Sequence, residues 1–197
     1  TVGANAAKVA AGFGANIALL DTNLERLRYL DDVTAPNIDC LFSDRHTIRE
    51  RLGWADLVVG SVLIPGARAP HLVAREDLRL MKPGAVIIDV AIDQGGCIAT
   101  SRPTSHAEPT FVIDDVVHYC VTNMPGAVGR TSTHALCNAT LPYVIQLAEQ
   151  GVEAAARASA PLASAVNIFQ GRLINAAVAS AFGMTSETHP FQQEATS

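Results

Sequence analysis

Short apolar runs, separated by segments with helical spacing, make up the first part of this chain. The clearest runs have little polar alternation, which is typical of strands that are covered on both faces in a parallel sheet. They lie at residues 17–20, 57–60 and 86–89, and weaker candidates lie at 39–42, 111–113 and 118–121. Helix-like segments come between them, at residues 4–11, 24–30, 47–52 and 75–81. The alternation predicts an α/β fold with a doubly wound parallel sheet, in which helices form right-handed crossover connections between the strands.

A small-residue helix near the amino end indicates what such a sheet would bind. Gly3 opens this helix, and Asp21 ends the strand that follows, at roughly the 20-residue spacing that a dinucleotide-binding motif requires. This is the helix, turn and second strand of a Rossmann-type unit. The first strand and the first two glycines of the motif are not in the sequence, so Gly3 corresponds to its last glycine. We therefore expect the chain to be the carboxyl-terminal part of a longer protein.

Asp21 is the residue that would select the cofactor. At the end of a strand, its carboxylate can accept hydrogen bonds from both hydroxyls of an adenosine ribose, whereas a 2'-phosphate would meet its negative charge. The position therefore favours NAD over NADP. The alternative is that Asp21 caps the following helix, and the two roles are compatible. Arg26, one helical turn further on, either lies along the adenosine or is a solvated surface charge.

Two further loops follow apolar runs and would border the same crevice. Ser61 begins the first, at residues 61–66, whose backbone either borders the dinucleotide or forms a plain turn. The second loop contains Asp93, followed closely by a glycine pair. Asp93 either keeps a carboxylate close to a nicotinamide ring during hydride transfer or is an ordinary turn former.

Composition and charge narrow the function classes. The 197 residues are 49% hydrophobic and 17% charged, as in a folded globular protein. A net charge of −5 without a basic stripe argues against a nucleic-acid partner. No apolar run approaches the roughly 20 residues of a membrane span, and no charged-then-apolar segment indicates export. We therefore expect a cytoplasmic protein without a membrane partner.

The cysteines and histidines form no recognisable site in the sequence. The four cysteines are widely spaced and include no Cys-x-x-Cys pair, so we expect reduced, buried thiols and no metal centre. The six histidines are scattered, and no nucleophile pairs with them. They are interpreted as surface or structural residues, which gives no support to a hydrolase triad.

The character of the sequence changes after residues 123–126. We place a nucleotide-binding domain at 1–124, incomplete at its start, and a helical segment at 125–197. The helices expected in that segment lie at 133–149, 152–158 and 174–182, with breaks at Gly151 and Pro161. They lack strands to cover, so we expect them to pack on an absent amino-terminal domain or on another subunit.

An ordered set of segments resembles the alanine dehydrogenase family, which is related to the NAD-binding subunit of proton-translocating transhydrogenase. The matching segments lie at residues 1–3, 19–21, 61–66, 81–84, 89–96, 101–106, 123–128 and 131–133. A set that keeps its order from the first residue to about residue 142 is more specific than any one motif. The later helices match the family in general character only.

The resemblance implies a hexameric cytosolic enzyme that converts L-alanine, NAD and water to pyruvate, ammonia and NADH, and the reverse. It implies that Asp93 is the catalytic acid. The family's catalytic histidine and its pyruvate-binding arginine and lysine belong to the amino-terminal domain and fall outside this sequence. By position, the family's cofactor contacts correspond to Asp21, Arg26 and Ser43 at the adenosine, Val62 and Leu63 along the cleft, and Val90, Asp93, Met124 and Pro125 around the nicotinamide.

Two alternatives remain open at this point. The first is the transhydrogenase subunit, whose loop typically resembles Asp-x-Ala-x-Glu-x-Gly-Gly-Asn, whereas this chain has Asp93 and, after the glycines, Cys97. The second is a non-catalytic module that senses NAD, for which Asp21 would suffice. Upstream sequence that carries the arginine, lysine and histidine would favour the enzyme.

Overall fold

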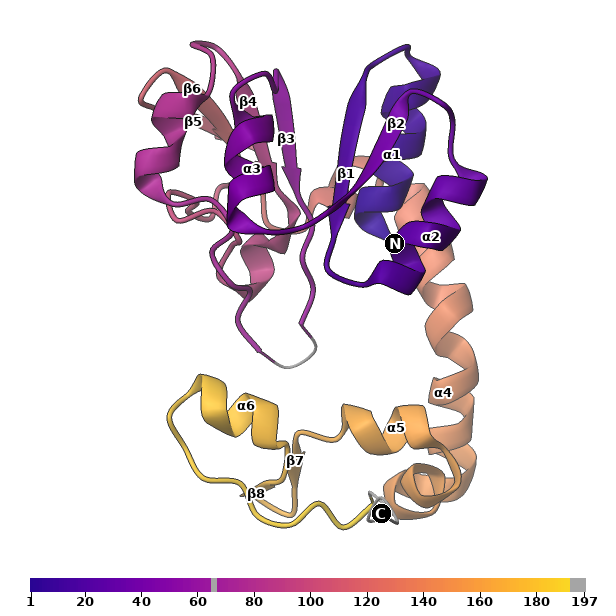
Figure 1. The fold of residues 1–197 in the computed structure, drawn as a ribbon. Helices are drawn as coiled ribbons and strands as arrows, with labels where there is room; N and C mark the ends of the chain where they lie inside the picture. Colours follow the sequence, from indigo (N-terminus) through magenta and orange to yellow (C-terminus); the bar gives the residue numbers. More distant parts are fainter. Residues whose placement is uncertain (65–66, 192–197) are drawn as a thin grey trace. The chain divides into compact units, whose positions relative to one another are not determined.

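The computed structural model describes residues 1–64 and 67–191, and Figure 1 shows its secondary structure. The chain divides into two compact units, which are described separately. The first consists of Thr1–Leu63 and Ala69–Met124, and the second of Ile64–Arg68 and Pro125–Ser197.

Parallel strands form the centre of the first unit, as the apolar runs predict. A two-stranded parallel sheet pairs β1 (Ile17–Asp21) with β2 (Ile38–Phe42). A four-stranded sheet has the order β3-β4-β6-β5, in which only β5 runs antiparallel to its neighbour. Its strands are β3 (Leu57–Gly60), β4 (Val86–Asp89), β5 (Thr110–Ile113) and β6 (Val116–Tyr119).

The hairpin between β5 and β6 corrects one predicted boundary. Asp114 and Asp115 have φ angles of 51° and 60°, so the chain reverses in a tight turn of the kind that favours Asp, Asn and Gly. The returning strand therefore begins at Val116 and not at residue 118. Val121, the predicted end, lies beyond β6 and forms an isolated bridge with Thr104.

The helices of the first unit begin at local caps. Asn23 caps α2 (Leu24–Val33) by accepting the Arg26 N–H at 2.9 Å, and Asp44 caps α3 (Arg45–Leu52) through the Thr47 N–H. α1 is Val2–Gly12, as the small-residue segment predicts.

The predicted helix at 75–81 is a 3-10 helix, η1 (Arg75–Leu80). The side chain of Asp77 is 2% exposed. Its carboxylate accepts a hydrogen bond from the Ala74 N–H at 3.0 Å and forms an ion pair with Arg49 of α3. This anchored carboxylate closes the first turn of η1 and fixes it against α3.

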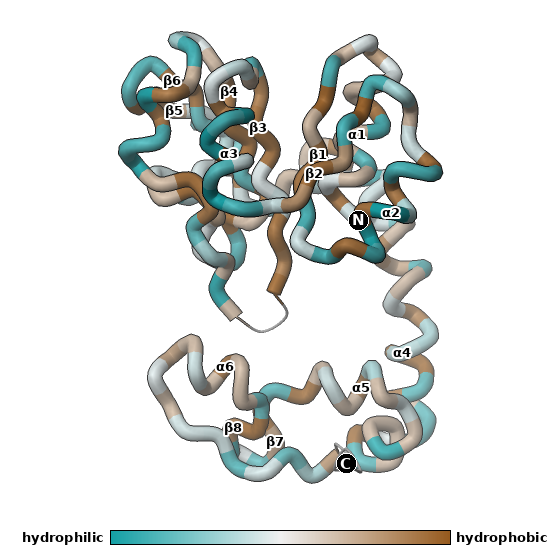
Figure 2. Tube along the Cα trace, in the orientation of Figure 1, coloured by the Kyte–Doolittle hydropathy of each residue, from teal (hydrophilic) through white to brown (hydrophobic). Residues whose placement is uncertain are grey.

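The core of the first unit lies along the central strands. Figure 2 shows apolar residues on β3 and β4 and polar ones along α3. Ile87 and Val116 are fully buried, and Leu78 of η1 packs in the same cluster. β4 buries one face completely and half-buries the other, and this partial cover of both faces accounts for its uninterrupted apolar sequence.

β1 and β3 are not paired in the part of the chain that the structure describes. β1 is bonded to β2 and β3 to β4, so each keeps one unpaired edge. α1 contacts both β1 and β3. In a Rossmann-type sheet the first strand lies between two such edges.

The second unit is mainly helical. α4 (Gly129–Ala158) is interrupted at Gly151, whose φ of 75° and ψ of 167° are not helical, so the predicted break is confirmed. The predicted break at Pro161 is wrong by two residues. Ser159 ends α4, and its hydroxyl accepts the Leu162 N–H at the start of α5 (Ala160–Ala165). Pro161 lies in the first turn of α5, where a missing N–H costs nothing.

A hairpin that the sequence analysis did not predict follows α5. β7 (Ile168–Phe169) and β8 (Arg172–Leu173) are antiparallel, and the turn uses Gln170 and Gly171 at φ angles of 50° and 78°. The final helix, α6 (Ala176–Ala181), is shorter than the predicted 174–182 because the Asn175 side chain caps it through the Val178 and Ala177 N–H groups.

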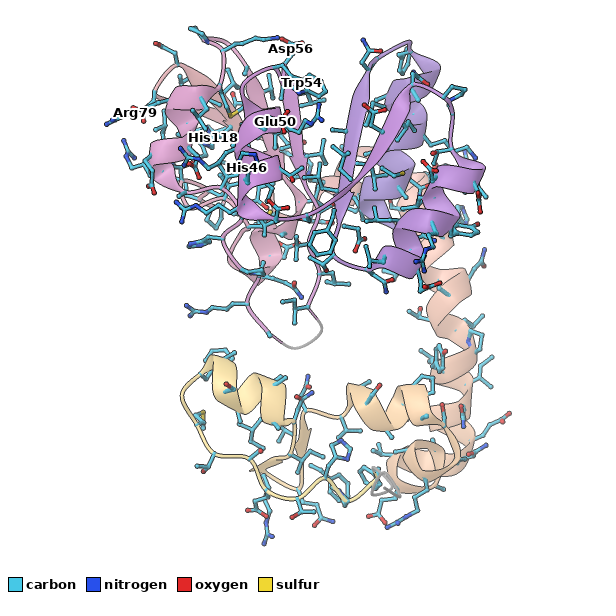
Figure 3. All side chains as sticks on the ribbon, in the orientation of Figure 1. His46, Glu50, Trp54, Asp56, Arg79 and His118 are labelled. Carbon is cyan, nitrogen blue, oxygen red and sulfur yellow. The ribbon has the colours of Figure 1, made fainter. Side chains whose placement is uncertain are left out.

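His118 is a buried histidine in β6, labelled in Figure 3. Its Nδ1 bonds to the Val116 carbonyl oxygen at 3.0 Å and its Nε2 to the Thr100 hydroxyl at 2.8 Å. The ring stacks on Phe111 with centroids 4.9 Å apart. Burial lowers the pKa of His118, although the Val116 bond and the Asp89 charge oppose this shift. The ring is therefore neutral at pH 7, with Nδ1–H donating and Nε2 accepting.

Acidification is expected to destabilise the protein through His118. The unfolded chain takes up the proton near pH 6.5, while the folded chain does not until a lower pH, so the free energy of unfolding falls as the pH drops below about 6.5. The slope approaches about 1.4 kcal/mol per pH unit. Urea titrations of the full-length protein between pH 5 and 7 measure it. His118→Gln, which does not titrate, should lose this slope, and an equal slope in both proteins would contradict the assignment.

Candidate functional site

The loop after β4 carries the candidate catalytic residue. Asp93 lies in the 3-10 helix η2 (Val90–Gln94) with its side chain exposed, while Val90 is half-buried. Gly95 and Gly96 then reverse the chain with φ angles of 91° and 81°. The glycine pair is therefore a backbone requirement, because both residues occupy the left-handed region that other residues avoid.

Asp89 organises this loop, a role that the sequence analysis did not assign to it. It ends β4 and is completely buried. Its Oδ1 accepts the Ala91 N–H at 3.0 Å, and its Oδ2 accepts the N–H groups of Cys97 at 2.9 Å and Ile98 at 3.2 Å. The available signal was a carboxylate at the end of an otherwise apolar run, since a buried carboxylate requires such donors.

Cys97 lies against Asp89, with its thiol 3.5 Å from Oδ1. Burial, followed by the charge of Asp89, raises the pKa of Cys97 to about 12. The thiol therefore stays protonated at neutral pH and donates weakly to the carboxylate. Of the other cysteines, Cys120 is also buried, but Cys137 is exposed, which corrects the expectation of uniformly buried thiols.

Gly3 and Ser61 lie side by side at the start of α1. A Cβ on Gly3 would stand 2.6 Å from the Ser61 Oγ, so a larger residue there would force the Ser61 hydroxyl to turn away. Val62 is half-buried against the core, and Leu63 is 73% exposed. The remaining predicted loop residues, Pro65 and Gly66, lie outside the described residues.

Asp21 ends β1 with a partly exposed carboxylate. Its Oδ1 accepts the Asn23 N–H at 2.9 Å, and among the described residues nothing donates to its Oδ2. Asn23, and not Asp21, is the cap of α2. Asp21 thus keeps an acceptor for a ligand hydroxyl. Arg26 is exposed, with its guanidinium 5.0 Å from the centre of the Tyr29 ring.

A cleft of about 260 Å³ opens beside the carboxyl ends of β1 and β2. Ser43 lies in its wall, next to the end of β2, and its N–H donates to the Asp21 carbonyl at 2.9 Å. His71 and Leu72 also face the cleft, although no pattern in the sequence marked them. The lining residues are Thr22, Ser43, Asp44, Arg45, Ile48, His71, Leu72, Ala74 and Asp77.

The cleft wall is tied to the loop that Asp89 organises. The Leu72 N–H donates to the Cys97 carbonyl at 2.7 Å, and the Ala99 N–H donates to the Val73 carbonyl at 2.9 Å. Val73 and Ile98 form a parallel bridge. The loop after β4 and the cleft wall at Leu72 are therefore joined directly by backbone hydrogen bonds.

Met124 and Pro125 are consecutive but fall in different units, Met124 ending the first and Pro125 continuing in the second. Both are in the 3-10 helix η3 (Met124–Val128). Asn123, just before them, has a φ of 56°, and its carbonyl lies 3.1 Å from the His106 Nε2. His106 therefore supports a backbone turn.

The described residues contain no group of three or more His, Cys, Asp or Glu side chains that could hold a metal ion. Among the same residues, none of the helices is both long and apolar enough to cross a membrane.

The residues at this edge of the first unit fit a dinucleotide. Asp21 has an unused carboxylate oxygen for a ribose hydroxyl, and Ser61 lies against Gly3 at the start of an 11-residue helix. Asp93 is exposed after β4, at the same end of the parallel strands. Ligands of doubly wound sheets bind at this end. The arrangement can hold a sugar, a phosphate and a reacting group near a carboxylate.

Comparisons with known proteins match nearly the whole chain. Residues 1–176 match the family described as "Alanine dehydrogenase/PNT, C-terminal domain". Alanine dehydrogenase of Halomonas elongata is 52% identical over 183 residues, covering 93% of this chain and 49% of that protein. Alanine dehydrogenase of Mycolicibacterium smegmatis is 50% identical over 179 residues, covering 91% and 48%. The chain thus spans about half the length of the curated relatives that it matches.

Two solved structures are also similar to this chain. An L-alanine dehydrogenase is 47% identical with a TM-score of 0.80, covering 92% of this chain and 50% of that one. A transhydrogenase from Sinorhizobium meliloti is 27% identical with a TM-score of 0.57, covering 66% and 36%. The fold is therefore shared with both, and the transhydrogenase is the more distant of the two.

Proposed function

The chain belongs to the alanine dehydrogenase/PNT family, and from this premise we propose that the full-length protein is an alanine dehydrogenase. Its reaction is the reversible oxidative deamination of L-alanine to pyruvate and ammonia. Family membership implies a nicotinamide nucleotide cofactor, and we propose that this cofactor is NAD. The observation that carries the proposal is the 52% identity, over 93% of this chain, to a protein named alanine dehydrogenase.

We assign the adenosine half of the cofactor to the cleft beside β1 and β2. Asp21 accepts the ribose hydroxyls through its unused oxygen, and Ser43 borders the same cleft. Arg26 lies in the first turn of α2, where it can cover the adenosine. Gly3 and Ser61 meet at the start of α1 and are assigned to the pyrophosphate, whose charge the helix N-terminus favours.

We assign the nicotinamide half to the loops after β3 and β4 and to the junction at residues 124–125. Val62, Leu63 and Val90 would bound the ring, with Met124 and Pro125. Bound NAD supplies the hydride acceptor. Asp93 is assigned as the catalytic acid, which holds or releases a proton at its carboxylate while the substrate nitrogen changes its protonation.

The remaining parts of the enzyme are assigned to the other half of the protein, by resemblance. They are the catalytic histidine, the arginine and lysine that bind pyruvate, and a strand between the unpaired edges of β1 and β3. The helices of the second unit would pack on that half. We further propose a homohexamer in the cytoplasm, with neither nucleic acid nor membrane as a partner.

The test is NADH oxidation by the full-length protein, followed at 340 nm. We expect oxidation with pyruvate plus ammonium, and little without ammonium or with glyoxylate in place of pyruvate. Hydride exchange between nucleotides without pyruvate would favour a transhydrogenase. NADH binding with no turnover under any condition would favour the sensing module and refute the enzyme.

The choice of NAD is expected to depend on Asp21. Asp21→Ala should lower the preference for NADH over NADPH, as the ratio of kcat/KM, by about 5- to 150-fold, the value of one charge-assisted contact of about 1–3 kcal/mol. Asp21→Asn keeps the acceptor for Asn23 and removes only the charge, so it should show much of the same shift. Asp39→Ala, on the exposed side of β2, is the control. An unchanged ratio in both Asp21 variants would remove this role.

A further inference from the structure

We propose that Asp89 is a positioning residue of the reaction, because its buried carboxylate folds the loop of residues 90–98 and thereby holds Asp93 in place. The inference rests on the proposed function, since it concerns the same site. Asp89 is 0% exposed, so it cannot touch the substrate itself. Its effect must pass through the loop.

Both oxygens of Asp89 are used as acceptors. Oδ1 bonds the Ala91 N–H inside η2, and Oδ2 bonds the N–H groups of Cys97 and Ile98 after the glycine pair. One side chain therefore joins the start of the loop to its end. Between the two contacts lie Asp93 and the two left-handed glycines.

A carboxylate is the side chain that this arrangement requires. An amide would direct its NH2 group at one of the backbone N–H groups in either orientation, because the donors approach both oxygens. A longer acid would not fit, since Gly96 and Gly60 already make room for the network. A Cβ on Gly96 would stand 2.8 Å from Oδ2, and one on Gly60 would stand 2.4 Å from the Cys97 thiol.

Asp93 depends on this support because it has none of its own. Among the described residues, no side-chain hydrogen bond or ion pair holds Asp93, and it is exposed. Its position is set by the backbone of η2, which the Asp89 carboxylate caps. A displacement of about 1 Å at a reacting group can cost about 100-fold in rate.

The experiment is a double-mutant cycle in the full-length protein with Asp89→Asn, Asp93→Asn and the double variant. We expect Asp89→Asn to lower turnover by about 10- to 100-fold, with a smaller change in the KM for NADH. In the Asp93→Asn background, the same change should lower turnover by less than about threefold, because a displaced amide loses no acid function. Losses that multiply would show an effect that does not pass through Asp93 and would overturn the proposal.

Amide hydrogen exchange provides a measurement that does not need activity. In Asp89→Asn, peptides covering 90–98 should exchange faster, while β5 and β6 stay protected. Asp56→Asn is the matched control, because Asp56, labelled in Figure 3, precedes β3 at the opposite end of the strands. It forms an exposed ion pair with Lys82. Uniform loss of protection in Asp89→Asn would mean a role in the whole fold and would overturn the proposal.

A milder variant covers the case in which Asp89→Asn does not fold. Cys97→Ala removes the thiol contact to Oδ1 and should lower turnover by about two- to fivefold, again without a further loss in Asp93→Asn. If the turnover losses of Cys97→Ala and Asp93→Asn multiply when the two substitutions are combined, the proposal is also overturned. If the wild-type protein lacks turnover but the exchange change remains selective, the proposed function fails while the role of Asp89 in folding the loop is supported.

Discussion

Asp93→Asn in the full-length protein is expected to lower turnover by about 10²- to 10⁴-fold, the usual contribution of a general acid or base. The substitution keeps the volume of the side chain and removes its charge. Because Asp93 is exposed and its position depends on the backbone of η2, we expect the thermal midpoint to change by little. Steady-state assays with pyruvate, ammonium and NADH, together with thermal denaturation, measure both quantities.

NADH affinity separates this role from cofactor binding. We expect the Kd for NADH, measured by nucleotide fluorescence, to stay within about threefold of wild type. Near-normal turnover in Asp93→Asn would exclude the catalytic assignment. A variant that unfolds would support the alternative of an ordinary turn former.

Gly96→Ala is expected to destabilise the protein by about 2–5 kcal/mol. A φ of 81° costs an alanine about 1–2 kcal/mol, and the new Cβ would stand 2.8 Å from the Asp89 Oδ2 and 3.1 Å from the Ser101 Cβ. Overpacking of this kind adds about 1–3 kcal/mol. Chemical denaturation of the full-length protein measures the loss, and turnover should fall with it because the carboxylate that folds the loop is displaced.

Gly95→Ala is the matched control for this prediction. Gly95 has a similar φ of 91°, but a Cβ there would meet nothing within 4 Å. Gly95→Ala should therefore lower the free energy of unfolding only by the cost of the left-handed backbone, about 1–2 kcal/mol. Equal losses in the two variants would show that the contact with Asp89 has no energetic weight.

The local pattern of the sequence was sufficient for most elements of the first unit. The uninterrupted apolar runs predict β1, β3 and β4 because strands that are at least partly covered on both faces favour apolar side chains in succession. The caps of α2 and α3, Asn23 and Asp44, are equally local, because each bonds to an N–H group only three residues away. Gly151 likewise breaks its helix through its own backbone conformation.

Elements whose form depends on distant or flanking partners were predicted less well. η1 is a 3-10 helix fixed by the contact of Asp77 with Arg49, 28 residues away. The break assigned to Pro161 falls at Ser159, because proline is compatible with a first helical turn. The β7–β8 hairpin is too short to show an alternating pattern.

The residues of the candidate site also fall into two groups, those that the sequence predicts and those that only the structure reveals. The sequence alone predicted Asp21 at the end of a strand and Asp93 in the loop after another, with a glycine pair close behind, because strand, turn and carboxylate are adjacent along the chain. Only the tertiary structure decided that Asp89 folds the loop and that His71 and Leu72 face the cleft. These roles arise where segments that are distant in the sequence meet in the fold. Buried polar groups there must form hydrogen bonds, and their partners belong to other segments.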